Sequence, residues 1–128
     1  MIEWLRKRKA KKAQEDVNDR TAREILVTFR TSHGETVEYY VWLRQLMVSG
    51  YLRIKMAEST LTIDGDVYNT KHITDMTAEV VAYGIVREDV KKRLDGYLGS
   101  AFTRWSIKDT FPESDIEDIT YVTEEEGD

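Results

Sequence analysis

The chain has 128 residues, a formal net charge of −5 and no cysteine. Its length fits one domain with a single hydrophobic core, and the missing thiols exclude disulfides, cysteine-zinc sites and cysteine nucleophiles. No apolar run approaches the roughly 20 residues that span a bilayer, so we expect no transmembrane segment. Because no apolar stretch follows the basic residues near the N-terminus, we also expect no secretory signal and a cytoplasmic location.

Charged residues are sorted along the chain. Residues 1–12 hold six cations and one acid, whereas residues 112–128 hold eight acids and no cation. Charge blocks at the ends of a chain are typical of arms that contact a partner or keep the fold solvated. The sequence therefore predicts a basic helical arm over residues 1–20, one α+β core domain over 21–111, and an acidic tail over 112–128.

The basic arm is predicted to be helical because residues 2–20 are rich in Ala, Lys, Arg, Gln and Glu, which favour helices. Its apolar residues are few: Ile2, Trp4, Leu5, Ala10, Ala13 and Val17. A helix with so thin an apolar stripe buries little by itself, so we expect it to fray or to dock on a partner.

Residues 24–43 predict a β-hairpin. Period-two alternation runs through two segments, Ile25, Val27 and Phe29 and then Val37, Tyr39, Val41 and Leu43. A short turn that contains Gly34 joins them, which is typical of a hairpin. The second strand carries large side chains on both faces, so Tyr40 and Trp42 need a cover of their own: a helix, a second sheet or a partner.

The next segment predicts additional strands. Residues 43–49 suit either a helical turn or a continuation of the second strand. Alternation at Leu52, Ile54 and Met56 predicts a third strand, and residues 60–63 predict a fourth.

Asp64-Gly65 then predicts a tight type I′ turn, because both central positions of that turn need a positive φ. The return strand starts at residue 67. Residues 73–81 continue this strand or form another one, which Gly84 is expected to end.

Residues 86–98 predict a helix, since Val86, Val90, Leu94 and Leu98 recur at intervals of four. An aromatic segment follows and is expected to fold back onto the core; it contains Phe102, Trp105, Ile107 and Phe111. Apolar residues within the acidic tail predict one short edge strand; they are Ile116, Ile119, Tyr121 and Val122.

These elements predict an α+β fold: an N-terminal basic helix, an antiparallel β-meander of four to six strands, a C-terminal helix packed on the sheet, and an acidic tail. Consecutive strands with short turns pair antiparallel. A sheet with one face covered by a helix is the economical way to bury its apolar side.

Catalytic and cofactor motifs are missing from the sequence. No nucleophile elbow, phosphate-binding loop or dinucleotide fingerprint occurs, so we expect a protein that is not an enzyme, with no catalytic residue, cofactor or metal. One alternative is a small metal-dependent enzyme, in which Asp64, Asp66, His72 and Asp75 supply ligands that suit Mg²⁺, Mn²⁺ or Ca²⁺. Two acids around a turn glycine are also what a hairpin favours.

The basic arm is the first candidate for a binding role. Its cations are Arg6, Lys7, Arg8, Lys9, Lys11 and Lys12. Behind Ile2, Trp4 and Leu5, they suit an anionic membrane surface, nucleic-acid phosphates, a protein partner, or the acidic tail of the chain itself. The net negative charge argues against nucleic-acid binding by the whole folded domain.

Aromatic residues are the second candidate. Tyr40, Trp42 and Trp105 either fill a two-sided core or mark a contact with a protein partner, and in the latter case a homo-oligomer is the simplest assembly. The leading hypothesis is a non-enzymatic protein-binding or assembly module, of a kind common among phage and mobile-element accessory proteins. A nucleic-acid-associated accessory protein that uses the basic arm is the alternative.

Overall fold

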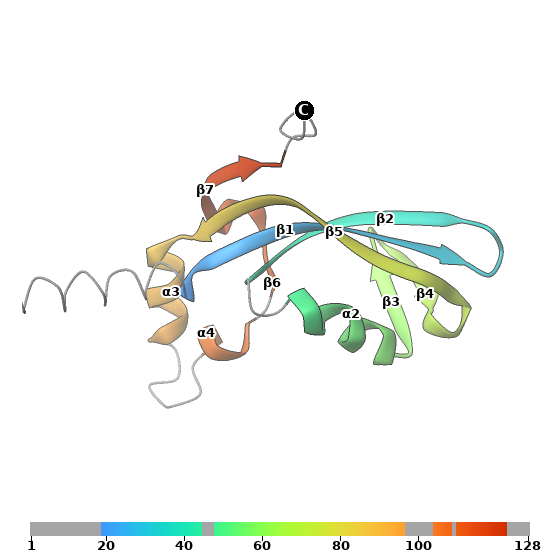
Figure 1. Ribbon diagram of the computed structural model, residues 1–128. Helices are drawn as coiled ribbons and strands as arrows, with labels where there is room; N and C mark the ends of the chain where they lie inside the picture. Colours follow the sequence, from blue (N-terminus) through green and yellow to red (C-terminus); the bar gives the residue numbers. More distant parts are fainter. Residues whose placement is uncertain (1–18, 45–47, 97–103, 109, 123–128) are drawn as a thin grey trace, which may run out of the picture.

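Five antiparallel strands form the central sheet, in the order β6-β2-β1-β5-β7, while β3 and β4 pair as a separate two-stranded sheet (Figure 1). The computed structural model describes residues 19–44, 48–96, 104–108 and 110–122. The elements in chain order are β1 (Thr21–Thr31), β2 (Thr36–Arg44), α2 (Val48–Ala57), β3 (Thr60–Ile63), β4 (Asp66–Asn69), η2 (Thr70–His72), β5 (Ile73–Val86), α3 (Glu88–Asp95), α4 (Arg104–Ile107), β6 (Thr110–Phe111), η3 (Glu113–Asp115) and β7 (Ile116–Tyr121).

The first predicted hairpin is confirmed: β1 and β2 pair antiparallel, with Leu26 opposite Tyr40. The alternating apolar residues of its first strand are fully buried, namely Ile25, Val27 and Phe29. The strand does not continue to residues 48–49, because α2 begins at Val48.

Residues 52–56 form part of helix α2, so the predicted third strand is wrong. The alternation of Leu52, Ile54 and Met56 is too short to separate a strand from a helix. Tertiary packing favours the helix: Tyr51 is buried in the core beneath β1, and its hydroxyl lies 3.0 Å from that of Tyr39. Ile54 and Met56 remain 47% and 39% exposed.

The second predicted hairpin, β3–β4, is confirmed. Asp64 and Gly65 have φ values of 50° and 87°, the positive values that a type I′ turn needs. However, the next strand, β5, pairs with β1 and not with β4, so the predicted meander is interrupted by this separate hairpin. β5 also runs through Gly84 to Val86, and Gly84 therefore does not end it.

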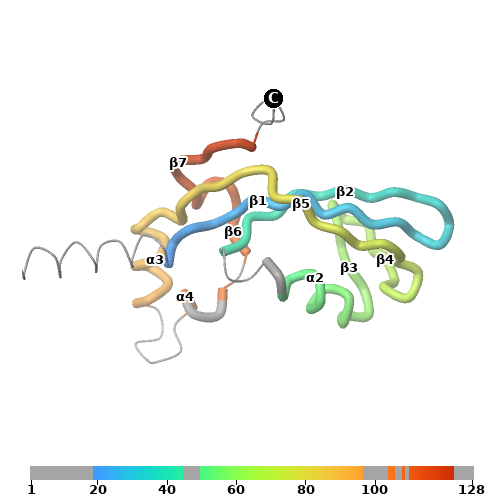
Figure 2. Tube along the Cα trace, in the orientation of Figure 1, coloured from blue at the N-terminus to red at the C-terminus, as the bar shows by residue number. Residues whose placement is uncertain are grey.

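The two faces of the sheet are covered by different elements (Figures 1 and 2). Trp42 and Leu43 are adjacent in β2, so their side chains point to opposite faces, yet they are only 2% and 0% exposed. On the Trp42 face, the cluster is completed by α3, α4, β6 and Ile116 of β7. On the Leu43 face, α2 contributes Tyr51, and β3 contributes Leu61 farther along the sheet.

The predicted C-terminal helix is confirmed but begins later than expected, because Val86 is the last residue of β5 and α3 begins at Glu88. Helix α3 lies on the sheet through Val90, which is 2% exposed, and Trp105 and Phe111 of the aromatic segment are buried in the same cluster. β7 is the edge strand predicted within the acidic residues. Residues 1–18 of the arm predicted over 1–20, and the last residues, 123–128, lie outside the described part of the chain.

Candidate interaction surface

Part of one sheet face is left uncovered by the described residues. Tyr40 and Trp42 are two residues apart in β2 and so point to the same face. Trp42 is 2% exposed, whereas Tyr40 is 63% exposed. Leu26 lies opposite Tyr40 on β1 and is half-buried. We call this region, formed by Glu24, Leu26, Tyr40, Tyr121 and Val122, the open face.

A row of paired residues brings β7 to the open face. Tyr121 is opposite Ala82, Ala82 is opposite Glu24, and Glu24 is opposite Trp42. Directly opposed residues of antiparallel strands share a face of the sheet. Two shallow grooves meet at Glu24 and Tyr40; one leads towards Tyr121 and the other towards Trp42.

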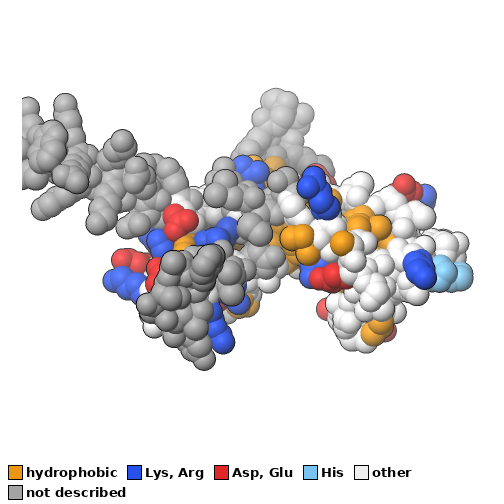
Figure 3. All heavy atoms as spheres, turned by 90° about the horizontal axis from the view of Figure 1, so that it is seen from below, with side chains coloured by type: hydrophobic (Ala, Val, Ile, Leu, Met, Phe, Trp, Pro, Cys, Tyr) orange, Lys and Arg blue, Asp and Glu red, His pale blue; other side chains and the backbone are white. Residues whose placement is uncertain are grey.

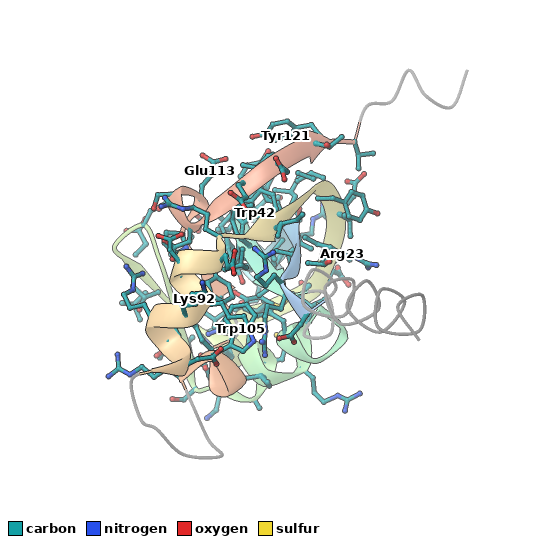
Figure 4. All side chains as sticks on the ribbon, turned by 90° about the vertical axis from the view of Figure 1, so that its left-hand side faces the viewer. Arg23, Trp42, Lys92, Trp105, Glu113 and Tyr121 are labelled. Carbon is teal, nitrogen blue, oxygen red and sulfur yellow. The ribbon has the colours of Figure 1, made fainter. Side chains whose placement is uncertain are left out.

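Carboxylates and a tyrosine hydroxyl interact beside these grooves. Burial, together with the negative charge of Glu113, raises the pKa of Glu24. The Tyr121 hydroxyl donates a hydrogen bond to Oε1 of Glu113 at 3.3 Å. The charge of Glu113 and, secondarily, burial raise the pKa of Tyr121. Figure 4 shows Glu113 and Tyr121 together at the outer side of Trp42, so negative charge is held next to exposed aromatic surface.

Acidic side chains continue along the open face. Glu79 is opposite Leu26, and Glu38 lies two residues before Tyr40; both are exposed. Lys108 borders the groove that leads to Trp42, and Arg30 lies on the same face towards the β1–β2 turn. The acids thus outnumber these cations, which favours a ligand of positive charge.

The predicted contact residues occupy different environments. Tyr40 is exposed, but Trp42 and Trp105 are 2% and 4% exposed and pack in one core cluster. Trp105 Nε1 donates a hydrogen bond to a carboxylate oxygen of Asp19 at 2.8 Å, and the Arg44 guanidinium carbon lies 4.5 Å from the Trp105 ring centroid. The predicted electrostatic arm lies outside the described residues: Arg6, Lys7, Arg8, Lys9, Lys11 and Lys12.

Asp19 ties the start of the described chain to the C-terminal elements. Its carboxylate lies 3.0 Å from Lys91 Nζ and 4.0 Å from Arg44 Nη1. Burial alone would raise the pKa of Asp19, but hydrogen bonds from Lys91 and Trp105 and the charges of Lys91 and Arg44 outweigh it, so the pKa is lowered. This cluster fixes the position of Asp19, the first residue that the structure describes, beside α3 and α4.

Sequence reasoning missed most of the open face. Only the alternation within β2 indicated that Tyr40 would need a cover. Glu24 and Glu113 gave no local signal, and the edge strand predicted at Tyr121 did not indicate its neighbours, because the β1–β5 and β5–β7 pairings bring these residues together over long separations in sequence. A residue predicted within an acidic tail therefore becomes part of a sheet surface.

The residues of the metal alternative lie in different elements, and Asp75 belongs to β5. Asp64 and Asp66 flank the β3–β4 turn. His72 lies in η2 with its Nδ1 3.4 Å from the Ser32 hydroxyl and its ring 5.7 Å from that of His33, at one end of the molecule (Figure 3). Within the described ranges, no group of three or more potential ligands is placed to hold a metal ion.

Comparison with protein-family models, curated proteins and solved structures finds no match for this chain. None of the helices in the described part of the chain combines the length and apolar character needed to cross a membrane. Function is therefore inferred from the geometry and charge of the open face.

Proposed function

We propose that the protein is a non-enzymatic assembly module that self-associates through the open face. One observation carries the proposal: a single sheet face is covered at Trp42 and uncovered at Tyr40, although both positions hold large aromatic side chains. Tyr121 and Val122 beside it are 54% and 49% exposed. Adjacent exposed apolar groups are typical of interaction surfaces, and tyrosine is enriched there because its ring packs while its hydroxyl stays hydrated.

The local architecture supports this role. The open face lies on β1, β2 and β7, which belong to one hydrogen-bonded sheet. Trp42 and Phe111 fill the core next to it. A surface supported in this way changes little on binding, which keeps the ordering cost of association low.

The test is light scattering after size exclusion, over a range of concentrations, for the full chain and for Tyr40→Ser. We expect the wild-type chain to form an oligomer and Tyr40→Ser to weaken its association at least tenfold, because central tyrosines commonly contribute about 2 kcal/mol or more to an interface. At a concentration where the wild type is also monomeric, the melting temperature should change little, since the Tyr40 ring is mostly in solvent in the single chain.

Tyr83→Ser is the matched control. Tyr83 is also a half-exposed tyrosine of the sheet, 44% exposed, but it pairs with Arg23 on the opposite face. Its substitution should leave association unchanged. A wild-type chain that stays monomeric at every concentration, or a Tyr40→Ser oligomer as tight as the wild type, would show that the proposed function is wrong.

A further inference from the structure

We infer that the occupant of the open face is the basic N-terminal segment, residues 1–12, of a second copy of this chain. This inference rests on the proposed function and deepens it, because it names the partner segment. Two properties of the open face identify the occupant: its apolar groups and its excess of acids.

The open face is both acidic and apolar. Glu24 belongs to it, Glu38 and Glu79 lie next to it on the same side of the sheet, and Glu113 borders it, hydrogen-bonded to Tyr121. The two cations on and beside this face offset only part of this charge. In the sequence, Val122 is followed by further acids: Glu124, Glu125, Glu126 and Asp128. A segment that binds here needs several cations and a few apolar side chains.

Residues 1–12 have this composition. Ile2, Trp4 and Leu5 are followed by six cations, and no acid lies between Leu5 and Glu15. Large apolar groups suit the surface around Tyr40, and cations at neighbouring positions suit the surrounding carboxylates. Such complementarity steers association and specifies the partner.

The path of the chain favours a second copy. The arm joins the fold at Asp19, which Lys91 and Trp105 hold near the start of β1. Along this face of β2, Arg44 lies beside Asp19, Trp42 is covered and Tyr40 is exposed. An arm that folded back over its own sheet would have to cross the cover of Trp42 to reach Tyr40. An arm from another copy can approach the open face from outside, and two-fold exchange covers both open faces.

The test uses two full-length variants and light scattering after size exclusion. The face variant is Glu24→Lys with Glu79→Lys, and the arm variant is Arg6→Glu with Arg8→Glu. We expect each variant alone to associate at least tenfold more weakly than the wild type. An equimolar mixture should form a heterodimer, because the intact arm of the face variant meets the intact face of the arm variant.

Glu88→Lys is the control for charge reversal in general. Glu88 is an exposed acid on α3, away from the open face, and pairs with Lys92 at 3.3 Å. It should associate like the wild type. Wild-type association should also weaken when the salt concentration is raised. Dissolved ions largely screen exposed charges that lie farther apart than about 10 Å at 0.1 M salt, and this distance shortens as more salt is added.

The outcomes separate this inference from the proposed function. If both charge variants associate like the wild type while Tyr40→Ser dissociates, the open face is an interface but residues 1–12 do not occupy it. If the variants dissociate but their mixture forms no heterodimer, the arm of a second copy is likewise not the occupant. A monomeric wild-type chain would overturn both.

Discussion

Gly84 is the position at which a single methyl group should perturb this fold most directly. A Cβ atom at Gly84 would lie 2.5 Å from Cγ2 of Ile116 and 3.3 Å from both Cζ3 of Trp42 and the carbonyl oxygen of Glu117. β7 can therefore pack over β5 and Trp42 only because this residue has no side chain. We predict that Gly84→Ala destabilises the protein.

The magnitude follows from two opposing effects. Alanine in a strand is favoured over glycine by about 0.5–1 kcal/mol through backbone entropy, whereas overpacking a filled core costs about 1–3 kcal/mol. Because the approach to Ile116 is far inside ordinary contact distance, we expect a net loss of about 1–2 kcal/mol. With a urea m-value of about 2 kcal/mol/M, the unfolding midpoint should fall by about 0.5–1 M.

Urea unfolding followed by tryptophan fluorescence and circular dichroism measures this change. Gly50→Ala is the matched control: Gly50 lies in α2, where an added Cβ atom would have no neighbour within 4 Å, so alanine there should stabilise by up to about 1 kcal/mol. Ile116→Ala should cost about 2–4 kcal/mol alone but about 1–2 kcal/mol less in the Gly84→Ala background. An unchanged midpoint for Gly84→Ala would show that the added methyl group does not destabilise the fold. Strict additivity in the double variant would show that contact with Ile116 is not the cause of the destabilisation.

Two further predictions concern ionised groups. Asp19→Ala should lower stability by about 1–2 kcal/mol at neutral pH, because the Trp105 indole and Lys91 lose it as a partner. Since the pKa of Asp19 is lowered from 3.8, the charge-dependent part of this difference should be lost as the pH falls through its folded-state value, while a neutral carboxyl can still accept the Trp105 bond; a difference that does not shrink in acid would contradict the assignment. Glu24→Gln should stabilise at neutral pH, because the raised pKa of Glu24 makes its charged form unfavourable in the fold. That gain should shrink as the pH falls towards 4.5, its ordinary value; paired urea titrations of variant and wild type measure both effects.

Local chemistry was enough to predict the elements whose signals lie within a few residues. The alternation of β1 and β2, the Asp64-Gly65 turn and the four-residue spacing that leads to Val90 were each recognisable in the sequence. Each depends on neighbouring residues alone: a strand alternates every two residues, a type I′ turn needs positive φ, and a helix repeats every 3.6 residues.

The sequence by itself therefore determined an antiparallel α+β fold, its first hairpin and the helix that follows the sheet. Tertiary structure decided that residues 52–56 are helical, because burying Tyr51 outweighs a short alternation, and that β5 pairs with β1. It also decided that Trp42 is core while Tyr40, on the same face, is surface. The reason is that burial depends on which distant segment lies over a strand, and here β6 and β7 cover one part of the face and leave the other open.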